Sequence, residues 1–249
     1  YLQVKVPKLY QTDQKQQWTN GIGNAMIKTV SIEIGGQEID KHYGEWLDIW
    51  GELNVDKNHR DCYNEMVGHD EDATVNNATF NRTLYVPLRF WFNRNPGLAL
   101  PLIALQYHEV KISVELENAV NLVRNNGTVA LTSVVDSGSN ALAVVSGSLW
   151  VDYIYLDTDE RRRFAQVSHE YLIEQLQFTG EESVTSSNQK IKLNFNHPCK
   201  ELVWVTQLDE CVKTGASDIT GCGISGAQWF NYTDKVDASP YKQNDALVF

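Results

Sequence analysis

The sequence has little cysteine, little positive charge and no long apolar run, and each shortage argues against a class of protein. Cysteine occurs four times in 249 residues. The four positions are far apart and include no C-x-x-C pair, so their spacing encodes neither a disulfide framework nor a zinc knuckle. Free thiols in a reducing compartment fit this pattern best. The cysteines are Cys62, Cys199, Cys211 and Cys222.

Basic residues are too few for broad contact with a nucleic acid backbone. The chain has 21 Lys and Arg against 32 Asp and Glu, a net charge of -11, whereas phosphate binding needs clustered basic side chains. The one compact basic run, Arg161 to Arg163, has Asp157, Asp159 and Glu160 beside it, which favours pairing within the chain. We expect no direct sequence-specific contact with nucleic acid.

Apolar runs are too short to span a bilayer. The longest, residues 98–105, contains Pro101, whereas a membrane helix needs about 20 apolar residues. No initiating methionine or signal peptide opens the chain, and residues 246–249 are apolar without a closing turn. We therefore expect no membrane span, and we expect both ends to be cuts within a longer polypeptide.

The motifs that carry catalytic or metal chemistry are also missing. The sequence has no G-x-S-x-G elbow, P-loop or Cys and His signature. Its six histidines include no His-x-His pair, which a metal-binding jelly roll of cupin type would need. The acidic run at residues 69–72 lacks an EF-hand pattern and is interpreted as a solvated loop. We expect no catalytic residue, no cofactor, no metal site and no enzyme.

What the sequence does contain is the alternation of an antiparallel sheet, clearest in residues 84–116. Apolar side chains occupy every second position of residues 84–92 and again of residues 110–116, which predicts two strands, each with one buried face. Pro87 places the first strand away from the centre of a sheet, because proline cannot donate to a ladder. Further strands are predicted at residues 1–6, 26–34, 129–135, 141–145, 148–156, 171–178, 190–195 and 201–208.

Helices are predicted only in the connections between strands. The first is capped by Asp40 and places Tyr43, Trp46, Leu47 and Trp50 on one face. The second covers residues 57–67 and ends at Gly68. The third is capped by Thr158 and runs to about Gln166, with acidic residues in its first turn and arginines behind them. Short strands with helices between them indicate a jelly roll or a related sandwich.

Four runs carry a resemblance to a known family. They are IEIGGQEIDKHYGEW, LYVPLRFWFNRNPGLALPLIALQYHEVKI, WVDYIYLDTDERRRFAQVSHEYLIEQLQFTG and LNFNHPCKELVW, and they span most of residues 32–204 in order. The chain resembles the major capsid protein of large nucleocytoplasmic DNA viruses, the chlorella virus and iridovirus type.

The resemblance implies an all-β double jelly roll, which is two antiparallel sandwiches in tandem. Residues 1–157 would form most of the first, 158–169 a connector and 170–249 the start of the second. It further implies a structural role: a homotrimer that forms pseudo-hexagonal capsomers and tiles an icosahedral shell. The expected partners are neighbouring capsomers and minor capsid proteins, and the expected location is the virion, assembled in the host cytoplasm.

Two features keep an alternative open. The chain has four N-x-[ST] sequons in predicted loops, which are possible glycosylation sites. It also has seven tryptophans, which would suit a carbohydrate-binding jelly-roll module of a larger protein, although core packing is their ordinary role. A stable trimer would indicate the capsid protein, and a monomer that binds sugars would indicate the module. The sequons are at Asn77, Asn81, Asn126 and Asn231.

Overall fold

Eight strands and short helices make up the computed structural model, which describes residues 1–7, 16–69, 81–125, 146–212 and 228–232. The strands are β1 (Leu2–Val6), β2 (Gln16–Trp18), β3 (Ile27–Ile34), β4 (Gln37–Tyr43), β5 (Arg82–Val86), β6 (Val110–Leu116), β7 (Val123–Asn125) and β8 (Ser146–Leu149). The α-helices are α1 (Ile22–Ala25), α2 (Gly44–Asn54), α3 (Lys57–Val67), α4 (Trp91–Arg94), α5 (Thr158–Gln166) and α6 (Asp209–Val212), and the 3-10 turns are η1 (Pro96–Leu98) and η2 (Ala119–Leu122).

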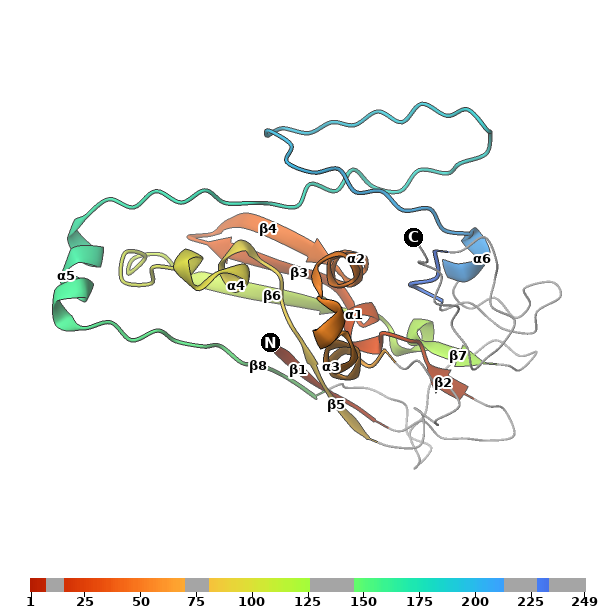
Figure 1. Ribbon diagram of the computed structural model, residues 1–249, viewed down its shortest axis with the longest axis horizontal. Coiled ribbons are helices and arrows are strands. Elements are labelled where there is room, and N and C mark those ends of the chain that lie inside the picture. Colours follow the sequence, from red (N-terminus) through yellow and green to blue (C-terminus); the bar gives the residue numbers. More distant parts are fainter. Residues whose placement is uncertain (8–15, 70–80, 126–145, 213–227, 233–249) are drawn as a thin grey trace.

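The described strands pair antiparallel in three small sheets (Figure 1). One has the order β5-β1-β8, a second has the order β4-β3-β6, and β2 pairs with β7. In the first, Val4 lies opposite both Leu84 and Gly147. Alternation then turns Leu2, Val4 and Val6 inward, and all three are buried.

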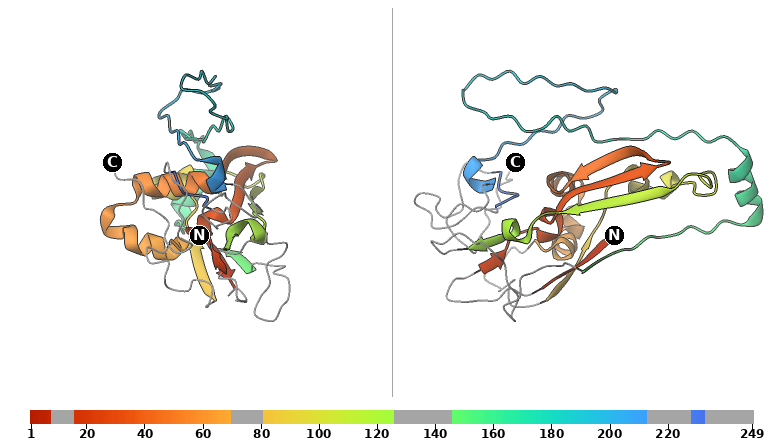
Figure 2. Two further views of the ribbon diagram at one scale, coloured as in Figure 1. Left: turned by 90° about the vertical axis from the view of Figure 1, so that its right-hand side faces the viewer. Right: turned by 180° about the vertical axis from the view of Figure 1, so that it is seen from behind.

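Helix α1 joins the two larger sheets, because it contacts both β5 and β3. Helices α2 and α3 lie beside it (Figures 1 and 2). The corner formed by α1, α2 and α3 is tightly packed. A Cβ on Gly44, the first residue of α2, would lie 2.5 Å from the carbonyl oxygen of Asn24. Gly68 ends α3 with a φ of 75°, a left-handed conformation that favours glycine.

Several predicted elements are confirmed. Strands β1, β3 and β6 lie where the alternation placed them, and α3 and its Gly68 end are as predicted. Helix α5 also spans the predicted residues, but its cap is Asp157 instead of Thr158. The Oδ1 atom of Asp157 accepts a hydrogen bond from the backbone N–H of Asp159 at 2.9 Å.

The prediction for residues 84–92 was partly wrong, because β5 ends at Val86. Pro87 follows at once, and the chain turns into helix α4 at Trp91. Leu88 and Phe90 are nevertheless buried. Their apolar pattern was correctly linked to a core, but these side chains reach it from an irregular segment.

The prediction that Asp40 caps a helix was wrong. Asp40 lies in β4, which returns from the Gly35-Gly36 turn and pairs with β3. Helix α2 starts only at Gly44. Of the side chains predicted to form its apolar face, Leu47 is buried, with 1% exposed, whereas Trp46 and Trp50 are half-buried.

The later predicted strands do not form sheets among the described residues. The strand predicted at residues 148–156 is represented only by its first two residues, at the end of β8 (Ser146–Leu149). Residues 167–208 run as extended chain around one side of the molecule, with α5 at the far end of the excursion (Figures 1 and 2). An extended segment gains ladder hydrogen bonds only from a partner strand, and no described segment pairs with these. The strands predicted at residues 129–135 and 141–145 lie outside the described residues.

Candidate docking site

The four sequons have different surroundings. Asn77 and Asn126 lie outside the described residues. Asn81 is exposed and immediately precedes β5. Asn231 is only 1% exposed, and its Nδ2, the atom to which a glycan would be attached, donates to Gln228 Oε1 at 2.7 Å. Of the two described sequons, therefore, only Asn81 presents its side chain to solvent.

No grouping of three or more His, Cys, Asp or Glu among the described residues is arranged to hold a metal ion. Cys62 and Cys199 are exposed free thiols and Cys211 is buried, while Cys222 is not among the described residues. The helices in the described parts of the chain include none that is long and apolar enough to cross a membrane.

The most developed polar site is a contact between strand β4 and residues 174–178, which we call the docked segment. Asp40 in β4 is buried, with 4% exposed. Its Oδ1 accepts two backbone hydrogen bonds, from Lys41 N at 2.9 Å and from Leu176 N at 3.1 Å. The side chain of Gln175 donates to the carbonyl oxygen of Ile39. One buried carboxylate thus binds the backbone of a segment that is 136 residues away in sequence.

His42 lies behind Asp40 on the same face of β4. Its Nε2 is 3.0 Å from Asp40 Oδ2, and both side chains are 1% exposed. The two atoms are at ion-pair distance without the alignment of a hydrogen bond. The imidazole also stacks on the ring of Phe90, with 4.6 Å between ring centroids. His42 therefore connects the docking contact to the hydrophobic core.

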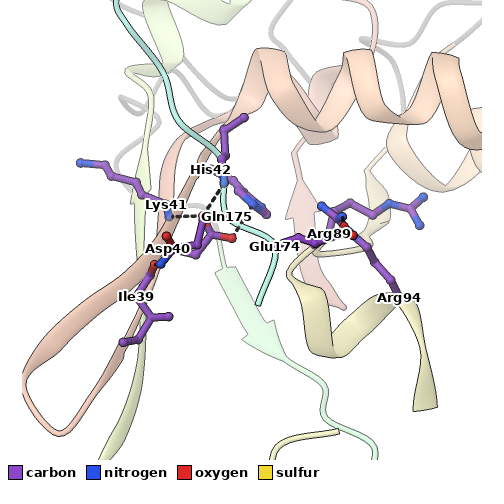
Figure 3. Close-up of polar contacts among 9 residues, drawn as sticks. Ile39, Asp40, Lys41, His42, Arg89, Arg94, Glu174 and Gln175 are labelled. Atoms are coloured by element: carbon purple, nitrogen blue, oxygen red, sulfur yellow. Dashed lines mark hydrogen bonds and ion pairs between the residues drawn. The ribbon is translucent and has the colours of Figure 1, made fainter. Parts of the chain in front are cut away.

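Arg94 at the end of helix α4 holds the other side of the docked segment. Its Nη1 is 2.8 Å from Glu174 Oε2, and its Nε donates to the carbonyl oxygen of Arg89 at 3.0 Å. The guanidinium also lies 4.0 Å from the centroid of the Trp50 ring, a cation–π contact. Figure 3 shows Glu174 and Gln175 lying between the β4 residues on one side and the two arginines on the other.

Glu174 also binds Lys200, which brings a second distant segment to the same point. Lys200 Nζ contacts Glu174 Oε1, the oxygen that Arg94 leaves free. The pKa of Glu174 is lowered, first because Lys200 donates a hydrogen bond to the carboxylate and also through the positive charges of Lys200 and Arg94. At the end of the docked segment, the ring of Phe178 lies 4.9 Å from that of Tyr43.

The contacts of this site join two distant segments of the chain by hydrogen bonds and ion pairs. Asp40 Oδ1 and Glu174 are paired with backbone N–H groups or basic side chains, whereas Asp40 Oδ2 and both ring nitrogens of His42 have no hydrogen-bond partner among the described residues. Sequence reasoning missed the site because Asp40 was assigned to a helix cap. The signal that could have placed Asp40 on a strand is the Gly35-Gly36 pair, because a two-residue glycine turn after a strand predicts a returning strand.

Antiparallel sheets joined by short helices place the described residues in the jelly-roll class of all-β folds. Comparison with known proteins places the chain more narrowly. The family model "Major capsid protein N-terminus" matches residues 1–157. The model "Large eukaryotic DNA virus major capsid protein" matches residues 160–245. The chain belongs to the major capsid protein family of large eukaryotic DNA viruses, which confirms the resemblance seen in the sequence.

Individual relatives agree. The chain is 46% identical over 278 residues to the major capsid protein of Phaeocystis pouchetii virus, covering 96% of this chain and 52% of that protein. It is 53% identical over 208 residues to the major capsid protein of Pyramimonas orientalis virus, covering 82% and 48%. A quasi-atomic model of the PBCV-1 virus capsid matches with a TM-score of 0.62 and 42% identity, covering 79% of this chain and 45% of that one. The chain thus spans about half the length of the curated relatives it matches.

Proposed function

We propose that the chain is part of a subunit that trimerises into pseudo-hexagonal capsomers and tiles an icosahedral shell. Its structural capsid role follows from the family. The homotrimer, the contacts with neighbouring capsomers and minor capsid proteins, and assembly in the host cytoplasm are the finer steps of the proposal. A jelly roll suits this role because it hides most of its strand edges and leaves stiff sides for large symmetric interfaces.

In the same proposal, residues 1–157 form most of a first jelly roll, residues 158–169 a connector, and residues 170–249 the start of a second. The observation that carries it is the junction of the two family matches at residues 157–160, where α5 begins. The docking site then holds the beginning of the second unit against β4 of the first. A rigid connection of this kind keeps the two units of a subunit at one angle during assembly.

The proposed role requires no catalysis and no bound metal or cofactor. Its test is the oligomeric state of the full-length protein by light scattering, together with mass spectrometry of purified virions. A stable trimer and an abundant virion component are expected. A monomer, or a trace component of virions, would overturn the proposal.

The same measurements distinguish the carbohydrate-binding alternative, which requires exposed aromatic platforms. Trp18 and Trp91 are buried, and Trp50 is covered by Arg94. Trp150 and Trp204 are 60% and 81% exposed, and they are the positions to test. Saturable sugar binding by a monomer, lost on Trp204→Ala, would favour the alternative.

A further inference from the structure

A second buried polar cluster lies where α1, α2 and α3 meet residues 228–232, which we call the anchor segment. Its central group is Asp48 of α2, which is 8% exposed. Asn24 of α1, which has no exposed surface, places its Nδ2 3.5 Å from Asp48 Oδ1 and 3.4 Å from the hydroxyl of Tyr63 on α3. One amide therefore serves two acceptors at long distances, which is weak compensation for a buried carboxylate.

Hydrogen bonds and apolar packing hold the anchor segment to the rest of the chain. The backbone N–H of Gln228 donates to the carbonyl oxygen of Cys211 at 2.9 Å. The indole N–H of Trp229 donates to the carbonyl oxygen of Asn121 at 3.0 Å. Phe230 packs on the α1 corner, where a Cβ on Gly21 would lie 3.0 Å from its ring. The same Cβ would lie 3.8 Å from Asp48 Oδ1, so Phe230 packs on the corner beside this carboxylate.

Tyr232, at the end of the anchor segment, is a second buried polar group in this part of the molecule. Its hydroxyl is buried and makes no hydrogen bond to any described residue. Its pKa is raised well above the ordinary value, first by burial and then by the negative charges of Asp48, Glu45 and Glu52. The hydroxyl thus stays neutral and adds no charge near Asp48.

The other groups around Asp48 are also mostly negative or neutral. Glu45 and Glu52 lie on the same helix, and burial raises the pKa of Glu45 as well. The cation that acts on Asp48 is Arg60 of α3, which already pairs with Glu52 at 2.6 Å. Arg89 acts on the neighbouring Tyr63, with 5.6 Å between its guanidinium and that ring. Burial, with a contribution from Glu52, raises the pKa of Asp48 to about 7, against the opposing effects of Asn24 and Arg60.

We propose that Asp48 is a proton-controlled switch for the anchor segment: protonated, it lets the segment pack on the α1–α2 corner, and ionised, it loosens that packing. The direction follows from linkage. A carboxyl exposed by opening returns toward its ordinary pKa of 3.8. Between that pH and about pH 7, the closed state keeps a proton that the open state has lost. Raising the pH through this window therefore lowers the closed-to-open ratio by up to tenfold per pH unit, and above it the ratio stays low.

Hydrogen exchange of the intact chain, read by mass spectrometry on a peptide covering residues 228–232, tests the proposal. After correction for the intrinsic exchange rate, opening of the wild-type anchor is expected to increase by up to about 100-fold from pH 5 to pH 7 and then level off. Asp48→Asn keeps the shape of the protonated side chain and is expected to abolish this dependence. An unchanged dependence in Asp48→Asn, or none in the wild type, would overturn the switch.

Two further variants keep the test decisive if Asp48→Asn does not fold. Asp61→Asn makes the same chemical change at an exposed position of α3 and should keep the wild-type dependence. Glu52→Gln removes a negative neighbour and frees Arg60, so the pH at which opening levels off should move down. If opening of the anchor segment levels off at the same pH in Glu52→Gln as in the wild type, the charge arrangement proposed here is contradicted.

Discussion

Residues 82–116 and residues 171–208 both contain segments in which apolar and polar side chains alternate, yet among the described residues only the first region forms strands. Leu84 in β5 pairs opposite Val4 and is 1% exposed. Leu172 has no partner strand among the described residues and is 86% exposed. The difference teaches that alternation specifies which face of a segment can be buried, while a partner strand decides whether it is buried.

The docked segment is intermediate between these two cases. It forms no ladder of hydrogen bonds with a described strand. Its backbone N–H at Leu176 donates to the carboxylate of Asp40, and its Glu174 side chain pairs with Arg94. Side chains of the folded region thus replace part of what a neighbouring strand would supply. We therefore expect the two regions to contribute differently to the free energy of unfolding, and substitutions in each region can test this.

The largest effect is expected where the two regions differ most in burial. Phe90 has no exposed surface and stacks on both His42 and Phe92. Phe90→Ala should lower the free energy of unfolding by about 3–5 kcal/mol, through lost burial and the cavity left behind. Leu172→Ala, the matched control in the exposed segment, should change it by less than about 0.5 kcal/mol. Urea unfolding measures both, and equal losses would show that the two regions are equally packed.

A smaller loss is expected at Asp40, the group that joins the regions. Asp40→Ala leaves the Leu176 N–H without its acceptor, which should cost about 1–3 kcal/mol. Hydrogen exchange at the Leu176 amide reports this contact directly. Asp40→Asn keeps one oxygen acceptor and should retain most of the protection. If the Leu176 amide exchanges equally fast in the wild type and in Asp40→Ala, the docked segment is not bound by this carboxylate.

The ion pair between Arg94 and Glu174 should contribute less, because Glu174 is partly exposed. A double-mutant cycle with Arg94→Ala and Glu174→Ala should give a coupling free energy of about 0.5–1 kcal/mol, reduced by salt. The folded pKa of Glu174 is depressed from 4.5, first by the hydrogen bond from Lys200. The stabilisation is therefore present above that pH and is lost as the pH falls below it. A coupling that does not weaken as the pH is lowered below 4.5 would contradict this assignment.

The sequence predicts the parts of this fold that depend on local pattern. The alternation of β3 and β6 and the glycine that ends α3 were readable because each is set by neighbouring residues. β4 was missed because its inward positions, Asp40 and His42, are polar and look like surface residues until a distant segment covers them. The docking site itself was unreadable, because it joins residues 136 apart in the chain.

The smallest effect is expected at an ion pair that lies wholly on the surface of the sheet. Lys28 Nζ is 2.7 Å from Glu115 Oε1 across β3 and β6, and both side chains are more than half exposed. The hydrogen bond from Lys28 lowers the pKa of Glu115, but solvent and salt screen such a pair. Glu115→Gln should therefore leave the melting temperature unchanged within error at low and high salt. A clear drop would mean that short ion pairs, irrespective of burial, stabilise this chain, and the contrast between the docking site and the surface would lose its physical basis.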